Sequence, residues 1–257
     1  MAQKETFSDS KPIIELIDIS KTYFQKSSMN HLVLDKISFS INAREFIVIM
    51  GSSGSGKTTL LNLIIGLLVP TLGKINIFRK DISLMNENQL ALLRQSKFGF
   101  VFQQFNLFDE LTAIENIELP LLINNNISPK ERKLRAEKLL DKFNLLHKKS
   151  SFPDELSGGE KQKIGIARAL ISDPEIILVD EPTGNLDSSS ASEIMDLFHL
   201  LNYEMKKTII MVTHDYNLVK PGMRYIQLEK GKVLRNILVT PEIKKRFYLE
   251  HELLLNT

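Results

Sequence analysis

The sequence predicts an α/β fold in which buried strands alternate with helices around one core. Three apolar runs, at 46–50, 176–179 and 209–212, have the length and unbroken hydrophobicity of strands that are buried on both faces. Two earlier segments, 13–19 and 33–41, instead alternate between apolar and polar residues, as half-buried strands do. We therefore expect a small antiparallel sheet laid against a core of parallel strands and helices.

The composition suits one large domain and excludes several classes of function. The chain has 257 residues, of which 43% are hydrophobic and 25% are charged, so it can bury a substantial core. A net charge of +2 falls short of the strongly basic surface of nucleic-acid-binding proteins, and no nucleic-acid partner is expected. Since there is no cysteine, disulfides, thiolate metal sites and cysteine nucleophiles are excluded, which suits a reducing compartment.

No segment is expected to enter or cross a bilayer. Residues 1–11 are polar and lack the apolar core of a signal peptide. The longest apolar stretch, 60–69, has about half the length of a membrane span and is interrupted by Asn62 and Gly66. Any role at a membrane would therefore depend on another chain.

The first predicted strand, 13–19, leads to Tyr23. The aromatic ring could stack on a flat base such as adenine, or it could cover the edge of the sheet. The residues alone do not separate these alternatives. The second strand, 33–41, and a turn at 42–44 then deliver the chain to the buried strand at 46–50.

Residues 51–58 fit the pattern G-x-x-x-x-G-K-[ST] between the strand at 46–50 and a helical stretch at 59–68. Glycines allow a tight turn whose backbone N–H groups converge on phosphate oxygens, and the following helix adds its positive N-terminal end. Lys57 would contact the β- and γ-phosphates, and the Thr58 hydroxyl would bind Mg²⁺. This segment predicts nucleotide binding.

After a turn, the pattern predicts a short strand at 74–78 and a helix at 83–94. Residues 98–108 then crowd aromatic side chains around two glutamines, the first of which is Gln103. The residues alone favour a buried strand without further function. A glutamine at the end of such a strand could also bring its amide oxygen to a metal ion or a water molecule.

Two helix starts are well marked. Residues 128–131 combine a serine cap, a proline at the first helical position and a glutamate three residues after the cap. A second helical pattern begins at Ser157, Gly158 and Gly159. A serine and two glycines at a helix N-terminus can bind an anion, although the residues alone favour an ordinary serine cap.

The buried strand at 176–179 ends in two carboxylates, Asp180 and Glu181. Ligands of open α/β sheets bind at the carboxyl ends of the strands, so Asp180 is expected to hold Mg²⁺ and Glu181 to polarise an attacking water. The strand at 209–212 presents His214 at the same edge. A single histidine is more often structural, but one beside a phosphate loop can bond the γ-phosphate.

These segments, in this order, resemble the ATP-binding subunit of ABC transporters, and the resemblance extends from residue 13 to about 235. The family's motifs correspond to Walker A at 51–58, the Q-loop at Gln103, the signature motif at 156–160, Walker B at 176–180 followed by Glu181, the D-loop at 185–187 and the switch histidine at His214. Tyr23 falls at the A-loop aromatic. The resemblance therefore favours the nucleotide-related interpretation of Tyr23, Gln103 and Ser157.

The resemblance implies a P-loop NTPase (RecA-like) core with an antiparallel β subdomain and an inserted α-helical subdomain. The ATP-binding domain would span 12–235. Its expected parts are the core at 12–84 and 160–235 and the helical subdomain at about 85–159. A flexible N-terminus at 1–11 would precede the domain, and a C-terminal extension at 236–257 would follow it. In that extension, 240–242 resembles a helix cap, and Ile243, Phe247 and Leu254 would pack on the same domain.

The resemblance also assigns roles within an ATP and Mg²⁺ site. Glu181 would be the general base, His214 and Lys57 would stabilise the γ-phosphate, and Gln103 would link the metal to the partner-facing surface. The metal would be held by Thr58, Gln103 and Asp180. The nucleotide contacts would be Tyr23, Gly51, Ser52, Ser53, Gly54, Ser55, Gly56, Lys57, Thr58, Thr59 and, from the second subunit of a head-to-tail dimer, Ser157, Gly158, Gly159 and Asp187.

Two positions depart from the commonest family pattern. Glu160 stands where glutamine is usual, and Lys163 stands where arginine is usual. Both lie outside the Ser-Gly-Gly segment that would touch phosphate. They concern the subfamily and the dimer contacts rather than the activity.

Within the family, the motifs are most similar to the branch of lipoprotein-release and macrolide- or peptide-export ATPases, with the cell-division ATPase nearby. The implied function is to drive an integral membrane permease subunit, at the cytoplasmic face of the inner (cell) membrane, for lipoprotein release or for export of a peptide, drug or lipid. The alternatives are an ATP-dependent switch without transport and a soluble clamp on ribosomes or DNA. The permease is expected to dock on 104–122, which is rich in apolar residues.

Overall fold

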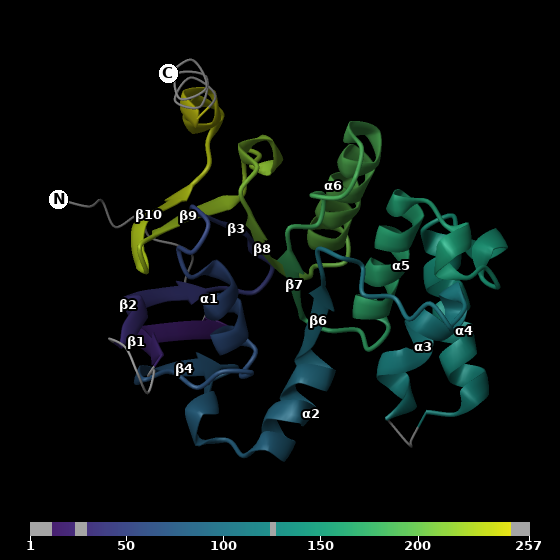
Figure 1. The fold of residues 1–257 in the computed structure, drawn as a ribbon, viewed down its shortest axis with the longest axis horizontal. Coiled ribbons are helices and arrows are strands. Elements are labelled where there is room, and N and C mark those ends of the chain that lie inside the picture. The colour runs from purple at the N-terminus through teal and green to yellow at the C-terminus, as the bar shows by residue number, and fades with distance from the viewer. Residues whose placement is uncertain (1–11, 24–29, 124–126, 248–257) are drawn as a thin grey trace.

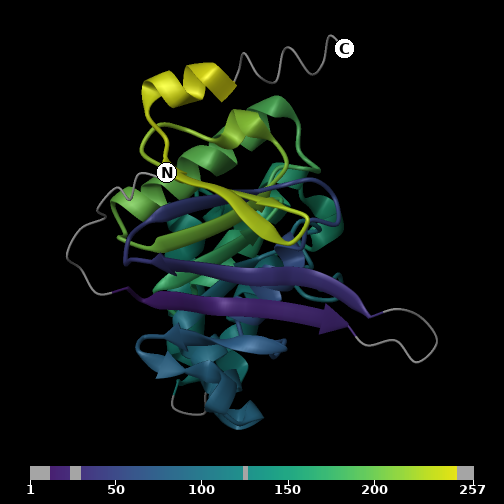
Figure 2. The same cartoon turned by 90° about the vertical axis from the view of Figure 1, so that its left-hand side faces the viewer.

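The fold is built from two sheets and the helices around them, as Figure 1 shows for the described residues 12–23, 30–123 and 127–247 of this computed structural model. The smaller sheet is antiparallel, with the strand order β2-β1-β4-β5. Its strands are β1 (Ile14–Tyr23), β2 (His31–Ile41), β4 (Leu72–Ile77) and β5 (Lys80–Asp81). Figure 2 looks onto this sheet, which confirms the antiparallel sheet predicted from the alternating segments.

The larger sheet has the order β10-β9-β3-β8-β7-β6 and is parallel except for the β9-β10 pair. Its strands are β3 (Phe46–Met50), β6 (Phe98–Val101), β7 (Ile176–Asp180), β8 (Thr208–Thr213), β9 (Arg224–Glu229) and β10 (Lys232–Leu238). All of β3 is buried. Val48 and Met50 face one hydrophobic cluster, and Ile47 and Ile49 face another. The continuous apolar run therefore does mark a strand covered on both faces.

The helices are α1 (Lys57–Ile64), α2 (Glu87–Lys97), α3 (Ala113–Leu122), α4 (Pro129–Lys142), α5 (Gly158–Leu170) and α6 (Ser188–Tyr203). Short 3₁₀ turns are η1 (Ile82–Leu84), η2 (Leu146–Lys148), η3 (Pro153–Glu155) and η4 (Tyr216–Leu218), and residues 241–247 are also helical. Within the described ranges, none of the helices has both the length and the apolar character that a membrane crossing requires.

The helices cover opposite faces of the larger sheet. Leu60 and Leu61 of α1 share one hydrophobic cluster with the small sheet, whereas α3, α4, α5 and α6 contribute to the other cluster. In Figure 1, α3, α4 and α5 gather at the end of the molecule away from the small sheet. Each fully buried aliphatic side chain contributes about 1.5–3 kcal/mol, so this packing fixes the sheet edge where β3, β7 and β8 end.

Several predicted elements have different ends in the structure, and local capping explains two of them. Helix α2 begins at Glu87 rather than at 83, because Asn86 and Gln89 cap each other's backbone N–H groups, both at 3.0 Å. Helix α1 ends at Ile64, and Gly66 follows it with φ 69°. Strand β6 stops at Val101, so most of 98–108 is loop rather than strand.

The loop after β6 is held by a buried asparagine. Asn116 of α3 is fully buried, and its side-chain oxygen accepts a hydrogen bond from the backbone N–H of Phe108 at 2.8 Å. Its amide group donates to the carbonyls of Phe108 and Leu111 at 3.0 and 2.9 Å. Because a buried amide without partners would be costly, these bonds fix the backbone of the loop while the Phe108 side chain stays exposed.

The beginning of the C-terminal extension packs on the same domain. Thr240 caps residues 241–247 by accepting from the N–H of Ile243 at 3.3 Å. Phe247 is 3% exposed, with its ring 4.8 Å from that of Tyr225. Of the other residues predicted for the termini, the segment 1–11 and Leu254 lie outside the described residues.

Candidate nucleotide-binding site

The glycine-rich loop between β3 and α1 closes around a lysine. The Lys57 ammonium donates to the carbonyls of Gly51 and Ser52 at 2.8 and 2.9 Å. Gly56 has φ 102°, which only glycine adopts readily. A Cβ at Gly51 would lie 2.0 Å from the carbonyl oxygen of Leu228. The loop therefore needs glycine at both positions to hold this shape.

A pocket of about 750 Å³ opens beside this loop. It brings together residues from the loop, from the first turn of α1 and from the ends of β7 and β8. The lining residues are His31, Val33, Gly51, Ser52, Ser53, Gly54, Gly56, Lys57, Thr58, Thr59, Asp180, Glu181, Val212 and His214. Ser55 is the one loop residue of the predicted set that is absent from the lining, because its side chain is buried beneath the loop.

The carboxylate pair sits at the carboxyl end of β7. Burial raises the pKa of Asp180, the neighbouring Glu181 raises it further, and Lys57 opposes both effects. Glu181 follows in the left-handed region with φ 43°, an uncommon conformation for a residue with a Cβ. Its backbone N–H is held by the carbonyl of Val212 at 2.9 Å. Both carboxylates therefore lie at the end of a buried strand, at the sheet edge, and Glu181 is held there in an uncommon backbone conformation.

Two side chains from other elements meet Glu181. Its Oε1 lies 3.0 Å from Nδ1 of His214, and its Oε2 accepts from the Gln103 amide at 3.4 Å. The Asn185 amide donates to the backbone carbonyl of Gln103 at 3.1 Å. The structure therefore gathers the predicted glutamine, glutamate and histidine around one point at the sheet edge.

A divalent cation fits this arrangement. Burial and then the nearby charge of Glu181 raise the pKa of Asp180, and a cation would offset both effects. The described residues contain no group of three His, Cys, Asp or Glu side chains that could hold a metal ion. A cation here would need hydroxyl, amide and phosphate oxygens as well, which is the donor set that Mg²⁺ prefers.

Tyr23 is a predicted site residue that does not line the pocket. It is 39% exposed, and the Lys21 ammonium lies 5.4 Å from its ring centroid. His31, which pairs with Tyr23 across the hairpin, does line the pocket. Sequence reasoning missed His31. The signal was its place at the start of β2, opposite Tyr23, but residues 24–30 gave no pattern from which to derive that register.

The predicted anion-binding helix start forms a separate surface. Ser157, Gly158 and Gly159 open α5 and are absent from the pocket lining, as is Asp187. Asp187 caps α6, and hydrogen bonds from the backbone and then the hydroxyl of Ser190 lower its pKa. A Cβ at Gly159 would lie 3.1 Å from the Ser190 hydroxyl. These residues lie close to one another, but they do not complete the pocket of their own chain.

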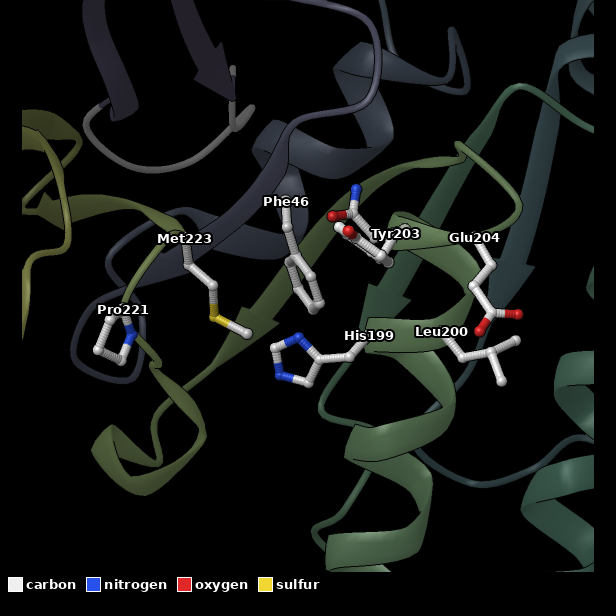
Figure 3. Close-up of a pocket in the computed structure, with 9 residues that line it drawn as sticks. Phe46, His199, Leu200, Tyr203, Glu204, Pro221 and Met223 are labelled. Atoms are coloured by element: carbon white, nitrogen blue, oxygen red, sulfur yellow. The ribbon is translucent and has the colours of Figure 1, made fainter.

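A second hollow, of about 490 Å³, lies at the opposite end of β3 (Figure 3). The side chains of Phe46, His199 and Met223 point toward one another in it. Burial lowers the pKa of His199, and nearby Lys220 adds to that effect. Among the described residues that line this hollow there is no lysine or arginine. Without such a cation, this hollow is poorly suited to bind a phosphate. The glycine-rich pocket is therefore the candidate nucleotide site.

Comparison with known proteins finds one matching family model and many similar chains. Residues 34–184 match the family model described as ABC transporter. An uncharacterised ABC transporter ATP-binding protein of Thermotoga maritima is 43% identical over 223 residues, which cover 87% of this chain and 94% of that protein. A lipoprotein-releasing system ATP-binding protein, LolD 1, of Chlorobium chlorochromatii is 42% identical over 86% of this chain and 90% of its own length.

Solved structures of ABC cassettes share the fold. One is the dimeric post-hydrolysis state of the cassette MJ0796 bound to ADP and Pi, with a TM-score of 0.79 and 41% identity over 88% of this chain and 98% of that one. The protein named MJ0796 comes from Methanocaldococcus jannaschii. A second, cbiO1 from Clostridium perfringens, has a TM-score of 0.80 and 27% identity over 95% of this chain and 94% of that one.

Proposed function

The chain belongs to the ABC transporter family and is an ATPase of that type, and on this premise we propose that it powers a separate integral membrane subunit that moves cargo. The observation that carries the proposal is the meeting of the Lys57 loop, Asp180, Glu181 and His214 in one pocket. We propose lipoprotein release, or export of a peptide, drug or lipid, because LolD-type and macrolide-export proteins are among its relatives.

Each group around the pocket has one proposed task in hydrolysis. Glu181 takes the proton of the attacking water, for which its carboxylate is positioned by His214 at 3.0 Å. Lys57 and His214 stabilise the charge on the γ-phosphate. Backbone N–H groups of the loop at 51–59 and the N-terminus of α1 bind the phosphate oxygens. Tyr23 stacks on the base from the end of β1.

We propose that Thr58, Gln103 and Asp180 hold a Mg²⁺ ion together with the nucleotide. The ion supplies positive charge that neutralises the phosphates during transfer. Asp180 is suited to this task because its carboxylate is half-buried beside Glu181, and both its desolvation and that neighbouring charge, which raise its pKa, would be offset by a cation. Gln103 reaches the same point from the loop after β6. It thereby connects the reacting centre with a loop on the outside of the domain.

Ser157, Gly158 and Gly159 are proposed to bind the nucleotide of a second copy in a head-to-tail dimer, with Asp187 beside them. Support comes from their position, since the helix start is apart from the pocket of its own chain. A relative of known structure is described as a dimeric cassette. Two-fold symmetry would complete both sites at once.

The dimer is tested with a hydrolysis-deficient variant. Glu181→Gln with Mg-ATP is expected to elute as a stable dimer in size-exclusion chromatography with light scattering, because the nucleotide that joins the copies is not consumed. The double variant with Ser157→Arg should remain a monomer, since a long side chain fills the space meant for phosphate. Ser128→Arg, at the start of α4, is the matched control and should still dimerise. A dimer that forms equally well without ATP would contradict the sandwich.

The C-terminal extension is proposed to be a structural addition rather than part of the reaction. Phe247 is buried against Tyr225, and the Lys244 ammonium donates to the Tyr216 carbonyl at 2.7 Å. Truncation before Thr240 is expected to lower the thermal midpoint by roughly 10 °C, because loss of one buried phenylalanine alone costs about 3–5 kcal/mol. ATP turnover at 25 °C should persist. A folded truncation with no ATPase activity would show that the extension acts in the cycle.

A further inference from the structure

The N-terminus of α5 carries a carboxylate that belongs to the chain itself. The Glu160 side chain folds back and accepts a hydrogen bond from the backbone N–H of Ser157 at 2.8 Å. In return, the Ser157 hydroxyl accepts from the backbone N–H of Glu160 at 3.3 Å. This reciprocal capping box holds the carboxylate at the first turn of the helix.

The charge at this point has two opposite effects. The N-terminus of a helix carries a partial positive charge of about half a unit, so the Glu160 carboxylate stabilises α5 in the isolated chain. An anion arriving at the same terminus meets that partial charge already offset by a full negative charge. The Glu160 carboxylate therefore competes with the nucleotide phosphate for the positive end of α5 at the proposed contact, 157–159.

The surroundings add further negative charge. Asp187 caps the neighbouring helix α6 through Ser190, whose hydroxyl approaches Gly159 closely. Two lysines follow Glu160 in α5, Lys161 and Lys163, and Lys163 is engaged by Glu193 of α6 at 2.8 Å. The helix start that would receive a nucleotide thus has two carboxylates close by, Glu160 and Asp187, and one of the two lysines that follow Glu160 is paired with a third carboxylate.

We infer that Glu160 limits the strength of the ATP-bound dimer by placing a negative charge beside the phosphate of the second copy's nucleotide. The inference rests on the proposed sandwich. In the free chain the charge strengthens the helix, and in the dimer it repels the ATP that joins the copies. Glu160 would thus keep the closed state weak enough to open again after each hydrolysis event.

The test uses Glu160→Gln in the full-length Glu181→Gln background. Glutamine can accept the same bond from Ser157, so the substitution removes the charge and preserves the cap. A charge at a helix terminus typically changes affinity by up to about fivefold, and two symmetric sites would together give about 25-fold tighter dimerisation. Analytical ultracentrifugation across ATP and protein concentrations measures this value.

Two further measurements separate a charge effect from a structural one. The thermal midpoint of the nucleotide-free variant should be equal or slightly lower, since the helix loses a favourable charge, whereas its dimer becomes tighter. The gain should also shrink as KCl is raised, because salt screens repulsion between charges. Glu131→Gln is the control, since Glu131 occupies the same third position after a serine cap in α4. It should leave dimerisation unchanged.

Failure of the inference and failure of the proposed function would give different results. If Glu181→Gln forms no dimer at any ATP concentration, the sandwich is wrong and the inference falls with it. If Glu181→Gln dimerises with ATP but Glu160→Gln leaves the dimer equally strong or weaker, the sandwich stands and only the inference is overturned. Tighter dimerisation that does not depend on KCl would also overturn it, because the effect would then not be electrostatic.

Discussion

Replacing Glu181 by glutamine is expected to lower the rate of ATP hydrolysis by roughly 10²–10⁴-fold, which is the usual contribution of a general base. Glutamine has nearly the same size as glutamate but cannot take up the proton of the attacking water. Nucleotide affinity should be retained, because the loop around Lys57 is untouched and the lost interaction acts only on the reacting water. The substitution is therefore expected to slow the chemical step and to leave nucleotide binding unchanged.

Single-turnover hydrolysis of Mg-ATP and equilibrium binding of a fluorescent ATP analogue measure the two quantities separately. Lys57→Ala should show the opposite pattern, with binding weakened because the cation held over Gly51 and Ser52 is lost. Glu204→Gln, an exposed carboxylate beside the second hollow, serves as the control for a lost negative charge. Normal turnover by Glu181→Gln would mean that another group activates the water.

Much of the fold could be predicted because the sequence repeats one simple signal. The strands β3, β7 and β8 are unbroken apolar runs, and the parallel sheet buries them on both faces. The residues that follow β7 and β8 must then lie at one edge of the sheet. That rule predicts that Glu181 and His214 lie together, and their side chains are 3.0 Å apart in the structure.

The structure adds what local patterns could not provide. The left-handed turn at Glu181 depends on the backbone bond to Val212 in the neighbouring strand, so no local motif predicts it. The place of His31 beside the phosphate loop follows from strand pairing across the small sheet. The start of α2 at Glu87 is a different case, because its capping box, Asn86 followed by Gln89, is present in the sequence but does not appear in the hydrophobic pattern from which the helix was predicted.

Burial narrows the proposed docking segment, 104–122. We expect some of its apolar residues to pack inside the helical subdomain, and Ile114 and Ile117 are buried there. Leu107 is half-buried and packs against the same cluster. Phe108 is 55% exposed, and acidic Asp109 and Glu110 beside it are exposed as well. A partner would therefore meet a smaller patch, centred on Phe108.

The segment is also tied to the reacting centre. Gln103 contacts Glu181 at one end of the loop. Arg168 of α5 donates to the carbonyls of Phe105 and Asn106 in the middle of the loop. We propose that a change at Gln103 when ATP binds moves this loop together with α5 as one body. The patch around Phe108 would transmit that movement to the membrane subunit.

Phe108→Asp is expected to abolish co-purification with the integral membrane subunit and to stop cellular function, because a charge replaces the exposed aromatic contact at the centre of the patch. Basal ATP hydrolysis by the free chain should persist, since Asn116 holds the backbone at this position and not the side chain. Affinity purification from detergent-solubilised membranes, with mass spectrometry of the captured proteins, measures the first effect.

Leu134→Asp is the matched control for this experiment. Leu134 is 44% exposed on α4 of the same helical subdomain, and it lies outside the docking segment, so its variant should keep the partner. Leu107→Arg should also lose the partner, but its packing against the core predicts a lower thermal midpoint as well. Phe108→Asp should therefore separate docking from stability.

If Phe108→Asp retained its membrane partner, docking on this segment would be wrong. If the unaltered chain captured no integral membrane protein but captured ribosomes or DNA, the transport function itself would give way to a soluble clamp.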